Sequence, residues 1–294
     1  MNPPHLHLPP SGSRRRALVH GCVLAGLLVL AYVFVVAAPQ KGTFGYDAYA
    51  YWRVDLADPY SQPLGSLGFF AYSPLFAMAV QPLTWLPWPA FVAVWWGVLL
   101  GALAYLGRRS LLVLLAFPPA AIELYHGNVH LLLAAAVVLG FRHPWAWSVV
   151  LLTKVTPGVG LLWFAFRREW RPLAYALGAT TLLVLVSALL TPDLWRAWLA
   201  LLLANAGGEM GFPALPIPLW LRLPLAVGVL AWGARTDRLW TVPLAATLAL
   251  PVLWIAGLSM LVGCWPLLGH ERPLARQYDA GHAATVPARA SAAG

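Results

Sequence analysis

The sequence predicts an all-α protein, a polytopic bundle of about eight to ten transmembrane helices, some of them short or broken. Hydrophobic residues make up 61% of the 294-residue chain and charged residues only 10%, whereas a soluble domain carries about 25% charged residues. Several apolar runs reach the ~20 residues that a spanning helix needs. These runs are continuous and do not alternate, so a transmembrane β-barrel is excluded.

The net charge of +9 comes almost wholly from arginine. In a soluble protein this excess would suggest a nucleic-acid partner. Here the arginines lie at the ends of apolar runs, where positive charge sets orientation and meets anionic lipid. We therefore expect the bilayer as a partner and no nucleic acid. Cys22 and Cys264 both lie inside apolar runs, and neither has metal-ligand spacing, so we expect no disulfide and no metal site.

The first apolar run, residues 17–38, follows three consecutive arginines. It exceeds the roughly 7–15 residues of a signal-peptide core, so we interpret it as a retained helix with its N-terminus in the cytoplasm. The flanking segments are Pro-rich or low in complexity. We therefore expect a disordered cytoplasmic segment at 1–16, a single transmembrane domain at 17–268, and a disordered tail at 269–294.

With the N-terminus inside, the polar loop 39–66 lies on the outer face of the cell membrane. The later apolar runs cover residues 67–87, 88–107, 110–124, 129–141, 145–166, 172–190, 219–234 and 240–268. The arginine pattern does not decide how many of them cross. If 67–87 is re-entrant, "GRRS" falls inside as the positive-inside rule requires, and the 145–166 run must then break at Pro157.

The outer loop holds one acid among aromatics, in the stretch "FGYDAYAYW". Asp47 has two interpretations. Tyr and Trp commonly mark the headgroup level, so the acid can be an incidental charge in an interfacial anchor. Alternatively, a carboxylate at this level can deprotonate an acceptor hydroxyl, with Tyr46, Tyr49 and Tyr51 packing against a sugar ring.

Lys154 interrupts the run "WAWSVVLLTKVTPGVGLLWFAF". A cation deep in the bilayer costs about 2.5–3.5 kcal/mol on insertion scales, so it needs a partner or a wet cavity. It can snorkel to the interface or pair with Glu123. The functional alternative is an anionic phosphate, helped by backbone N–H groups that Pro157 would expose.

The break "YHGNVH" supplies His126, Asn128 and His130 around Gly127. Catalytic zinc generally takes three protein ligands, and no third one lies nearby. Hydrogen bonds to sugar or phosphate are the favoured interpretation, and a plain helix–helix turn at Gly127 is the alternative. The sequence has no P-loop, no dinucleotide fingerprint and no serine or cysteine triad pattern.

Taken in order, "YDAYAYW", "DPY", "FAYSPLFAMAVQPLTWLP", "GNVH", "TKVTPG" and "RREW" resemble glycosyltransferase family 87. The resemblance covers roughly residues 44–171. It implies a transmembrane helical bundle of the GT-C type and a hexosyltransferase, often a mannosyltransferase, that uses a polyprenyl-phosphate sugar and no further cofactor. The acceptor would be a lipid or glycan hydroxyl at the outer leaflet. The "G-Q-x-N" step of the family is Gly127-Asn128-Val129-His130 here, so both polar positions differ.

By this resemblance Asp47 is the general base, Lys154 lies near the donor phosphate, and Asn128 takes the place of the family glutamine. We further expect His126, His130 and Arg53 on the donor side, and Tyr46, Tyr49, Tyr51 and Tyr72 along the substrate. Arg53 can equally pair with Asp55 or Asp58. A transporter or flippase of lipid-linked substrates, or a non-catalytic membrane scaffold, are the rival functions. A transporter would favour inverted repeats, which the sequence does not show.

Overall fold

The computed structural model describes residues 11–204 and 217–268, with the side chains of 11–15 left aside. The predicted disordered tail and the first ten residues of the predicted N-terminal segment lie outside the described residues. The first helix begins at Ser11, six residues before the predicted start at Ala17.

Every regular element of the described chain is helical, which confirms the predicted all-α class. The α-helices are α1 (Ser11–Tyr32), α2 (Ala38–Lys41), α3 (Tyr46–Trp52), α4 (Pro74–Val80), α5 (Trp88–Gly107), α6 (Leu111–Leu115), α7 (Pro118–His126), α8 (His130–Gly140), α9 (Trp147–Thr153), α10 (Leu162–Phe166), α11 (Trp170–Leu190), α12 (Pro192–Ala204), α13 (Leu219–Arg235) and α14 (Thr241–Leu248). Between them lie a π-helical turn η1 (Val33–Ala37) and the 3₁₀ helices η2 (Gln81–Trp85), η3 (Arg108–Ser110), η4 (Pro144–Ala146) and η5 (Thr156–Leu161), and the 3₁₀ helix η6 (Ile255–Leu267) follows α14.

Three described helical segments are long and apolar enough to cross a membrane: Arg16–Lys41, Trp88–Leu115 and Trp170–Leu190. The number becomes four if α7 and α8, which meet at a bend of 115°, form one broken span. The chain is thus a multi-pass membrane protein. Full-length helices are fewer than the eight to ten predicted spans, because several apolar runs are divided into short pieces.

Proline accounts for two of these divisions. In the 67–87 run, Pro74 occupies the first turn of α4, and Pro82 falls at the junction between α4 and η2. In the 145–166 run, α9 ends at Thr153. The ring of Pro157 would clash with the Thr153 carbonyl four residues earlier in a continuous helix. The 145–166 run is therefore broken at residues 154–155, as is required if 67–87 is re-entrant.

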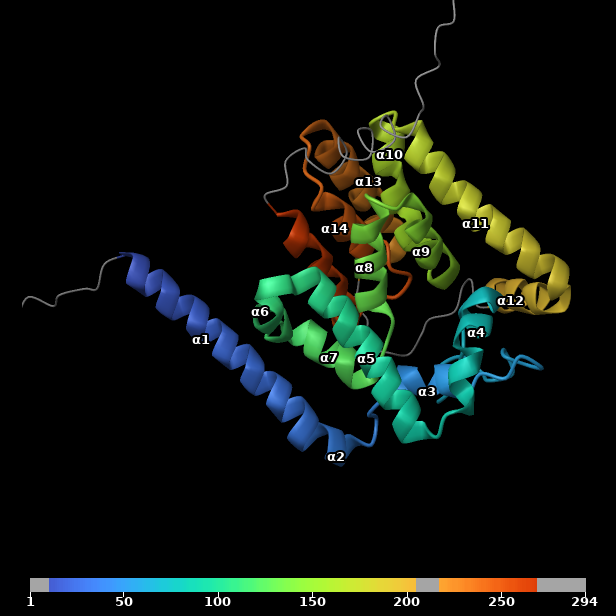
Figure 1. The fold of residues 1–294 in the computed structure, drawn as a ribbon, viewed down its shortest axis with the longest axis horizontal. Coiled ribbons are helices and arrows are strands. Elements are labelled where there is room, and N and C mark those ends of the chain that lie inside the picture. Colours follow the sequence, from blue (N-terminus) through green and yellow to red (C-terminus); the bar gives the residue numbers. More distant parts are fainter. Residues whose placement is uncertain (1–10, 205–216, 269–294) are drawn as a thin grey trace, which may run out of the picture.

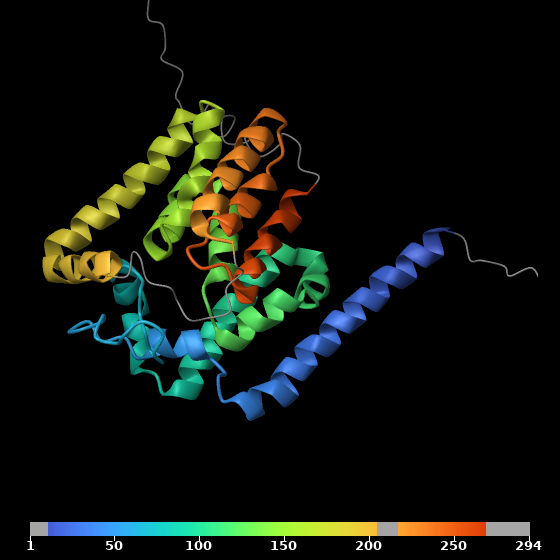
Figure 2. The same ribbon diagram turned by 180° about the vertical axis from the view of Figure 1, so that it is seen from behind.

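Two long helices flank the bundle on opposite sides, α1 and α11 (Figures 1 and 2). Helix α1 contacts the body mainly through α6 and α7. At that contact Gly26 lies so close to Ala116 that an added Cβ atom would come 1.8 Å from the Ala116 carbonyl oxygen. Only glycine permits this approach of two backbones.

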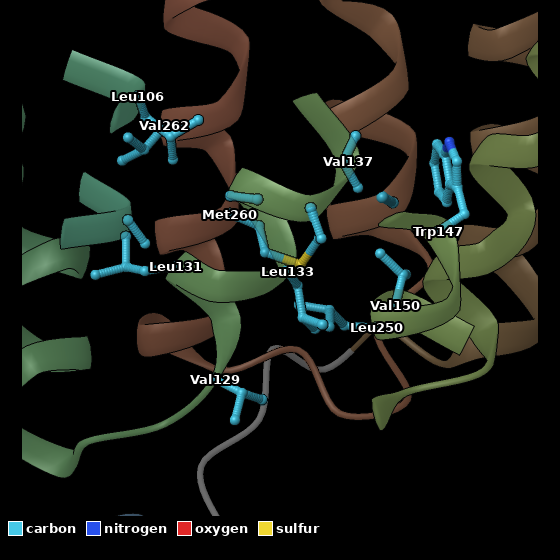
Figure 3. Packing of buried hydrophobic residues seen from close by; sticks show 14 of the residues in the cluster. Leu106, Val129, Leu131, Leu133, Val137, Trp147, Val150, Leu250, Met260 and Val262 are labelled. Carbon is cyan, nitrogen blue, oxygen red and sulfur yellow. The ribbon is translucent and has the colours of Figure 1, made fainter. Parts of the chain in front are cut away.

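Helix α8 forms the centre of the bundle and packs against α5, α9, α14 and η6. Leu131, Leu133 and Val137 project from it towards different neighbours (Figure 3), and all three are fully buried. Trp147 fills the space beside them. An added Cβ at Gly140 or Gly160 would approach the Trp147 ring to 2.5 Å or 2.4 Å. The N-terminus of α8 lies at the end of the bundle where α3 is found (Figure 1).

Candidate active site

The site is built where α3 docks onto the bend between α7 and α8. Gly45 precedes α3 with a positive φ of 70°, and its N–H donates to the Tyr125 carbonyl at 2.8 Å. Thr43 and Tyr125 share a side-chain hydrogen bond of 2.8 Å. These bonds hold the N-terminal turn of α3, and with it Asp47, against the end of α7.

Gly127 permits the closest contact of this docking. It ends α7 with a φ of 69°, and its carbonyl accepts a hydrogen bond of 2.7 Å from the Trp95 indole. An added Cβ would lie 2.7 Å from the Cβ of Ala48. The turn predicted at Gly127 is therefore present, and it lies directly beneath the residue that follows Asp47.

Replacing Gly127 with alanine is expected to lower stability by about 2–4 kcal/mol, from the left-handed backbone and the overpacked contact together. The matched control is Gly101→Ala in α5, where an added Cβ meets nothing within 4 Å. That control should gain about 0.5–1 kcal/mol from helix propensity. Thermal melting of the purified proteins in detergent measures both. Equal melting temperatures for the two variants would contradict the close packing of α3.

Asn128 orients the Asp47 carboxylate. The Asn128 Oδ1 accepts from the Val129 N–H at 2.7 Å and from the Tyr72 hydroxyl at 3.4 Å. This fixes the amide so that its nitrogen faces Asp47, with which its side chain forms a hydrogen bond. The predicted Asn128 thus lies in the site, where its side chain contacts Asp47, Tyr72 and the Val129 N–H.

One oxygen of Asp47 is left without a protein partner. The residue is partly exposed, yet its Oδ2 is covered and has no hydrogen bond among the described residues. Burial raises the pKa of this carboxyl, while Asn128, His126 and Lys154 oppose that rise. A covered carboxylate oxygen with a free lone pair and a raised pKa is the arrangement that a general base requires.

The predicted substrate tyrosines divide into two groups. Tyr51 is fully buried, and its hydroxyl is 2.8 Å from that of Tyr72, which in turn reaches Asn128. Burial raises the pKa of both phenols, so both remain protonated. Tyr51 therefore holds Tyr72 in place from within the core, and we revise its predicted position along the substrate.

Tyr46 and Tyr49 lie on the loop side of α3. The Tyr46 hydroxyl donates to the Gly65 carbonyl at 3.1 Å. The Tyr49 ring packs against Trp52 and Trp88, with centroids 5.7 Å apart in each pair. Tyr46 and the half-buried Tyr72 lie within electrostatic reach of Asp47.

Lys154 enters the same site from α9. It follows the end of that helix in extended conformation, with φ −140° and ψ 114°. Its Nζ lies 2.8 Å from His130 Nε2 and 5.9 Å from the centre of the Tyr72 ring. Its charge reaches both Asp47 and Glu123. The structure thus brings the predicted acid and the predicted cation together from segments more than one hundred residues apart.

His130 lies behind Lys154 and has both ring nitrogens engaged. Its Nδ1 is 2.9 Å from Glu123 Oε2, and its backbone N–H donates to Glu123 Oε1 at 2.6 Å. His130 and Glu123 are fully buried. We therefore revise the predicted direct contact of His130 with a donor. The sequence named Glu123 only as a direct partner of Lys154, whereas the structure connects the two through the imidazole.

The remaining predicted donor-side residues lie at the edge. His126 is half-buried, with its Nδ1 3.0 Å from the Ile122 carbonyl and its ring against Trp254. Arg53 is exposed and lies over the Trp52 ring at 5.8 Å. Among the described residues it forms no ion pair with Asp55 or Asp58. Within the same described residues no group of three or more His, Cys, Asp or Glu lies close enough to hold a metal ion.

Comparison with known proteins gives one match. The sequence model described as glycosyltransferase family 87 matches residues 70–277. The matched segment includes Tyr72, Glu123, Asn128, His130 and Lys154, whereas Asp47 and the rest of α3 precede it. It continues beyond the resemblance noted in the sequence, through the C-terminal helices. No curated protein and no solved structure matches.

Proposed function

Because the chain belongs to glycosyltransferase family 87, we propose that this membrane glycosyltransferase moves a hexose, in the first instance mannose, from a polyprenyl-phosphate donor to a hydroxyl group. The acceptor is a lipid or glycan at the outer leaflet of the cell membrane. No cofactor is needed besides the lipid-linked donor. Membership of the family supports the class of reaction, and the geometry of the site supports the mechanism that we propose for it.

In the proposed reaction Asp47 Oδ2 removes the proton of the acceptor hydroxyl. The acceptor oxygen attacks the anomeric carbon from the face opposite the phosphate and forms the new glycosidic bond. The bond between the anomeric carbon and the phosphate oxygen breaks, and its electron pair leaves with the polyprenyl phosphate. One displacement of this kind inverts the anomeric configuration.

Lys154 has the complementary role. Negative charge grows on the phosphate as it departs, and a fixed cation in a poorly hydrated site stabilises that charge more than the ground state. Lys154 is suited to this because its Nζ has a single acceptor contact among the described residues, His130 Nε2. Its other N–H groups remain available to an anion.

The observation that carries the proposal is the unpartnered Asp47 Oδ2 within electrostatic reach of Lys154. Buried polar atoms are almost always paired in native proteins. In a transferase, an unpaired carboxylate oxygen within electrostatic reach of Lys154 is best explained by a substrate proton that the oxygen meets during turnover.

The donor class is tested with the full chain in proteoliposomes. We expect transfer of labelled mannose from polyprenyl-phosphate mannose to an alkyl mannoside or to total membrane lipid, and none from a nucleotide-linked mannose. Polyprenyl-phosphate glucose supplied in parallel tests the sugar. NMR of the product should show the anomeric configuration opposite to that of the donor. Transfer from the nucleotide sugar, or product with retained configuration, would contradict the proposal.

A further inference from the structure

Behind Lys154 lies a buried chain of three ionisable side chains from different elements. Glu123 comes from α7, His130 begins α8, and Lys154 follows α9. The contacts are 2.9 Å from Glu123 Oε2 to His130 Nδ1 and 2.8 Å from His130 Nε2 to Lys154 Nζ. Gly257 of η6 packs against the His130 ring, since an added Cβ there would lie 3.8 Å from His130 Nε2.

The hydrogen-bond pattern fixes the tautomer of His130. An ammonium group donates hydrogen bonds and cannot accept them. The proton of the neutral imidazole must therefore be on Nδ1, which faces Glu123. Nε2 then carries a lone pair and can only accept, and it accepts from the ammonium group of Lys154. The two hydrogen bonds therefore run in one direction: Lys154 donates to His130, and His130 donates to Glu123.

We propose that Glu123 and His130 are positioning residues that hold the Lys154 ammonium at the reacting centre. Glu123 sets the imidazole tautomer, and the imidazole binds one of the three ammonium protons. This directs the other two away from His130, towards the departing phosphate. The functional part of this inference rests on the proposed phosphate role of Lys154, whereas the hydrogen-bond order does not.

Glu123 also has a structural task. Its carboxylate receives the backbone N–H groups of His130 and Leu131 at the start of α8, where it compensates the helix dipole. Loss of activity in a Glu123 variant would therefore not separate positioning from folding. His130 offers the better comparison, because its side chain can be changed without removing the backbone contacts.

The first test reads the tautomer directly. The intact wild-type protein, labelled with ¹⁵N-histidine and held in nanodiscs, is measured by NMR, and the His130 signals are assigned by their loss in His130→Gln. We expect a neutral imidazole protonated at Nδ1. A ring protonated at Nε2, or at both nitrogens, would overturn the inference whether or not the protein transfers sugar.

The second test compares two substitutions at His130. Glutamine places a carbonyl oxygen near the former Nε2 and can still accept from Lys154. Asparagine places its amide near the former Nδ1 and keeps the contact with Glu123 but cannot reach Lys154. We expect His130→Asn to lower the kcat of transfer by about 10²-fold, because a misplaced catalytic group costs about that much. The kcat of His130→Gln should stay within about tenfold of the wild-type value. The comparison requires the two variants to have the same melting temperature.

Equal rates for His130→Asn and His130→Gln at matched stability would overturn the positioning role. Failure of the proposed function looks different. In that case the wild type itself transfers no mannose from polyprenyl-phosphate mannose, while the NMR result still decides the hydrogen-bond order. If the wild type transfers mannose and His130→Asn transfers it equally well, the positioning role is wrong and the proposed function stands.

Discussion

Replacement of Asp47 with asparagine is expected to abolish sugar transfer, with a fall in rate of about 10²–10⁴-fold, the usual contribution of a general base. The amide is nearly isosteric with the carboxylate and has no basic oxygen to accept the acceptor proton. Donor binding should remain at the wild-type level, because the donor contacts are assigned to Lys154. Initial rates with polyprenyl-phosphate mannose, and donor competition in the same proteoliposomes, measure the two quantities.

The matched control is Asp55→Asn on the same loop. Asp55 is exposed, and its Oδ1 accepts the Ala57 N–H at 2.9 Å, so its loss should change the rate by less than about twofold, as is usual for surface groups. A wild-type rate in Asp47→Asn would exclude Asp47 as the base. It would leave the family membership untouched.

The pH profile supplies an independent readout for the same residue. The base acts in its deprotonated form, and burial raises the pKa of Asp47. The rate should therefore fall on the acid side at a higher pH than for an exposed aspartate. His126, Glu123 and Lys154 are the charged or titratable groups that act on this carboxyl from the other elements. The residual rate of Asp47→Asn should lack this acid limb.

Replacement of Lys154 with methionine is the second large effect. The side chain keeps its length and loses its charge, so the departing phosphate loses its fixed cation. We expect the rate of transfer to fall by about 10²–10³-fold, as when a single preorganised group that stabilises transition-state charge is removed. Donor affinity should fall as well, since the phosphate of the bound donor is already anionic.

Lys41→Met is a natural control, because Lys41 and Lys154 are the two lysines of the chain. Lys41 ends α2 at an exposed position and has no role in the proposed site. Its substitution should leave rate and donor affinity unchanged. If Lys154→Met instead kept wild-type donor affinity and rate, Lys154 would be a structural partner of His130 and no more.

The sequence predicted the helical class, allowed a break near Pro157 and singled out Asp47, Asn128 and Lys154, which lie within reach of one another. Each of these rests on local chemistry. Proline inside a helix removes a hydrogen bond, and an acid or a lysine is conspicuous in a chain with 10% charged residues. The count of spans was less accessible. The 240–268 run reads as one long helix, but it consists of α14, an irregular turn and the 3₁₀ helix η6.

The Glu123–His130 contact shows why part of the site was missed. The two are seven positions apart in the sequence, and in a straight helix they would lie about 10.5 Å apart along the axis. The 115° bend between α7 and α8 brings their side chains to 2.9 Å. The available signal was a single acid in the run 110–124, but the sequence does not give the angle at which a helix pair bends.

The place of Tyr51 was hidden for a related reason. Helix α3 has seven residues, about two turns, which is too short for periodicity to show which side faces the core. Ala48 and Tyr51 turn out to share the buried side, three positions apart. Asp47 lies four positions before Tyr51 and therefore on the same side of the helix, which turns it towards Tyr72 and Asn128. This outcome depends on the docking at Gly127.

The connector Gly127–Val129 between α7 and α8 has a mechanical consequence. It has three residues, and its length sets the direction in which each residue of α8 points. One inserted residue would turn α8 by about 100° if its axis stayed in place. His130 would swing away from Glu123 and Lys154 at once, while Leu131 and Leu133 would leave their places in the core. The length of this connector thus fixes the rotation of α8 in the bundle. Insertions should be tolerated least here and better in the exposed turns.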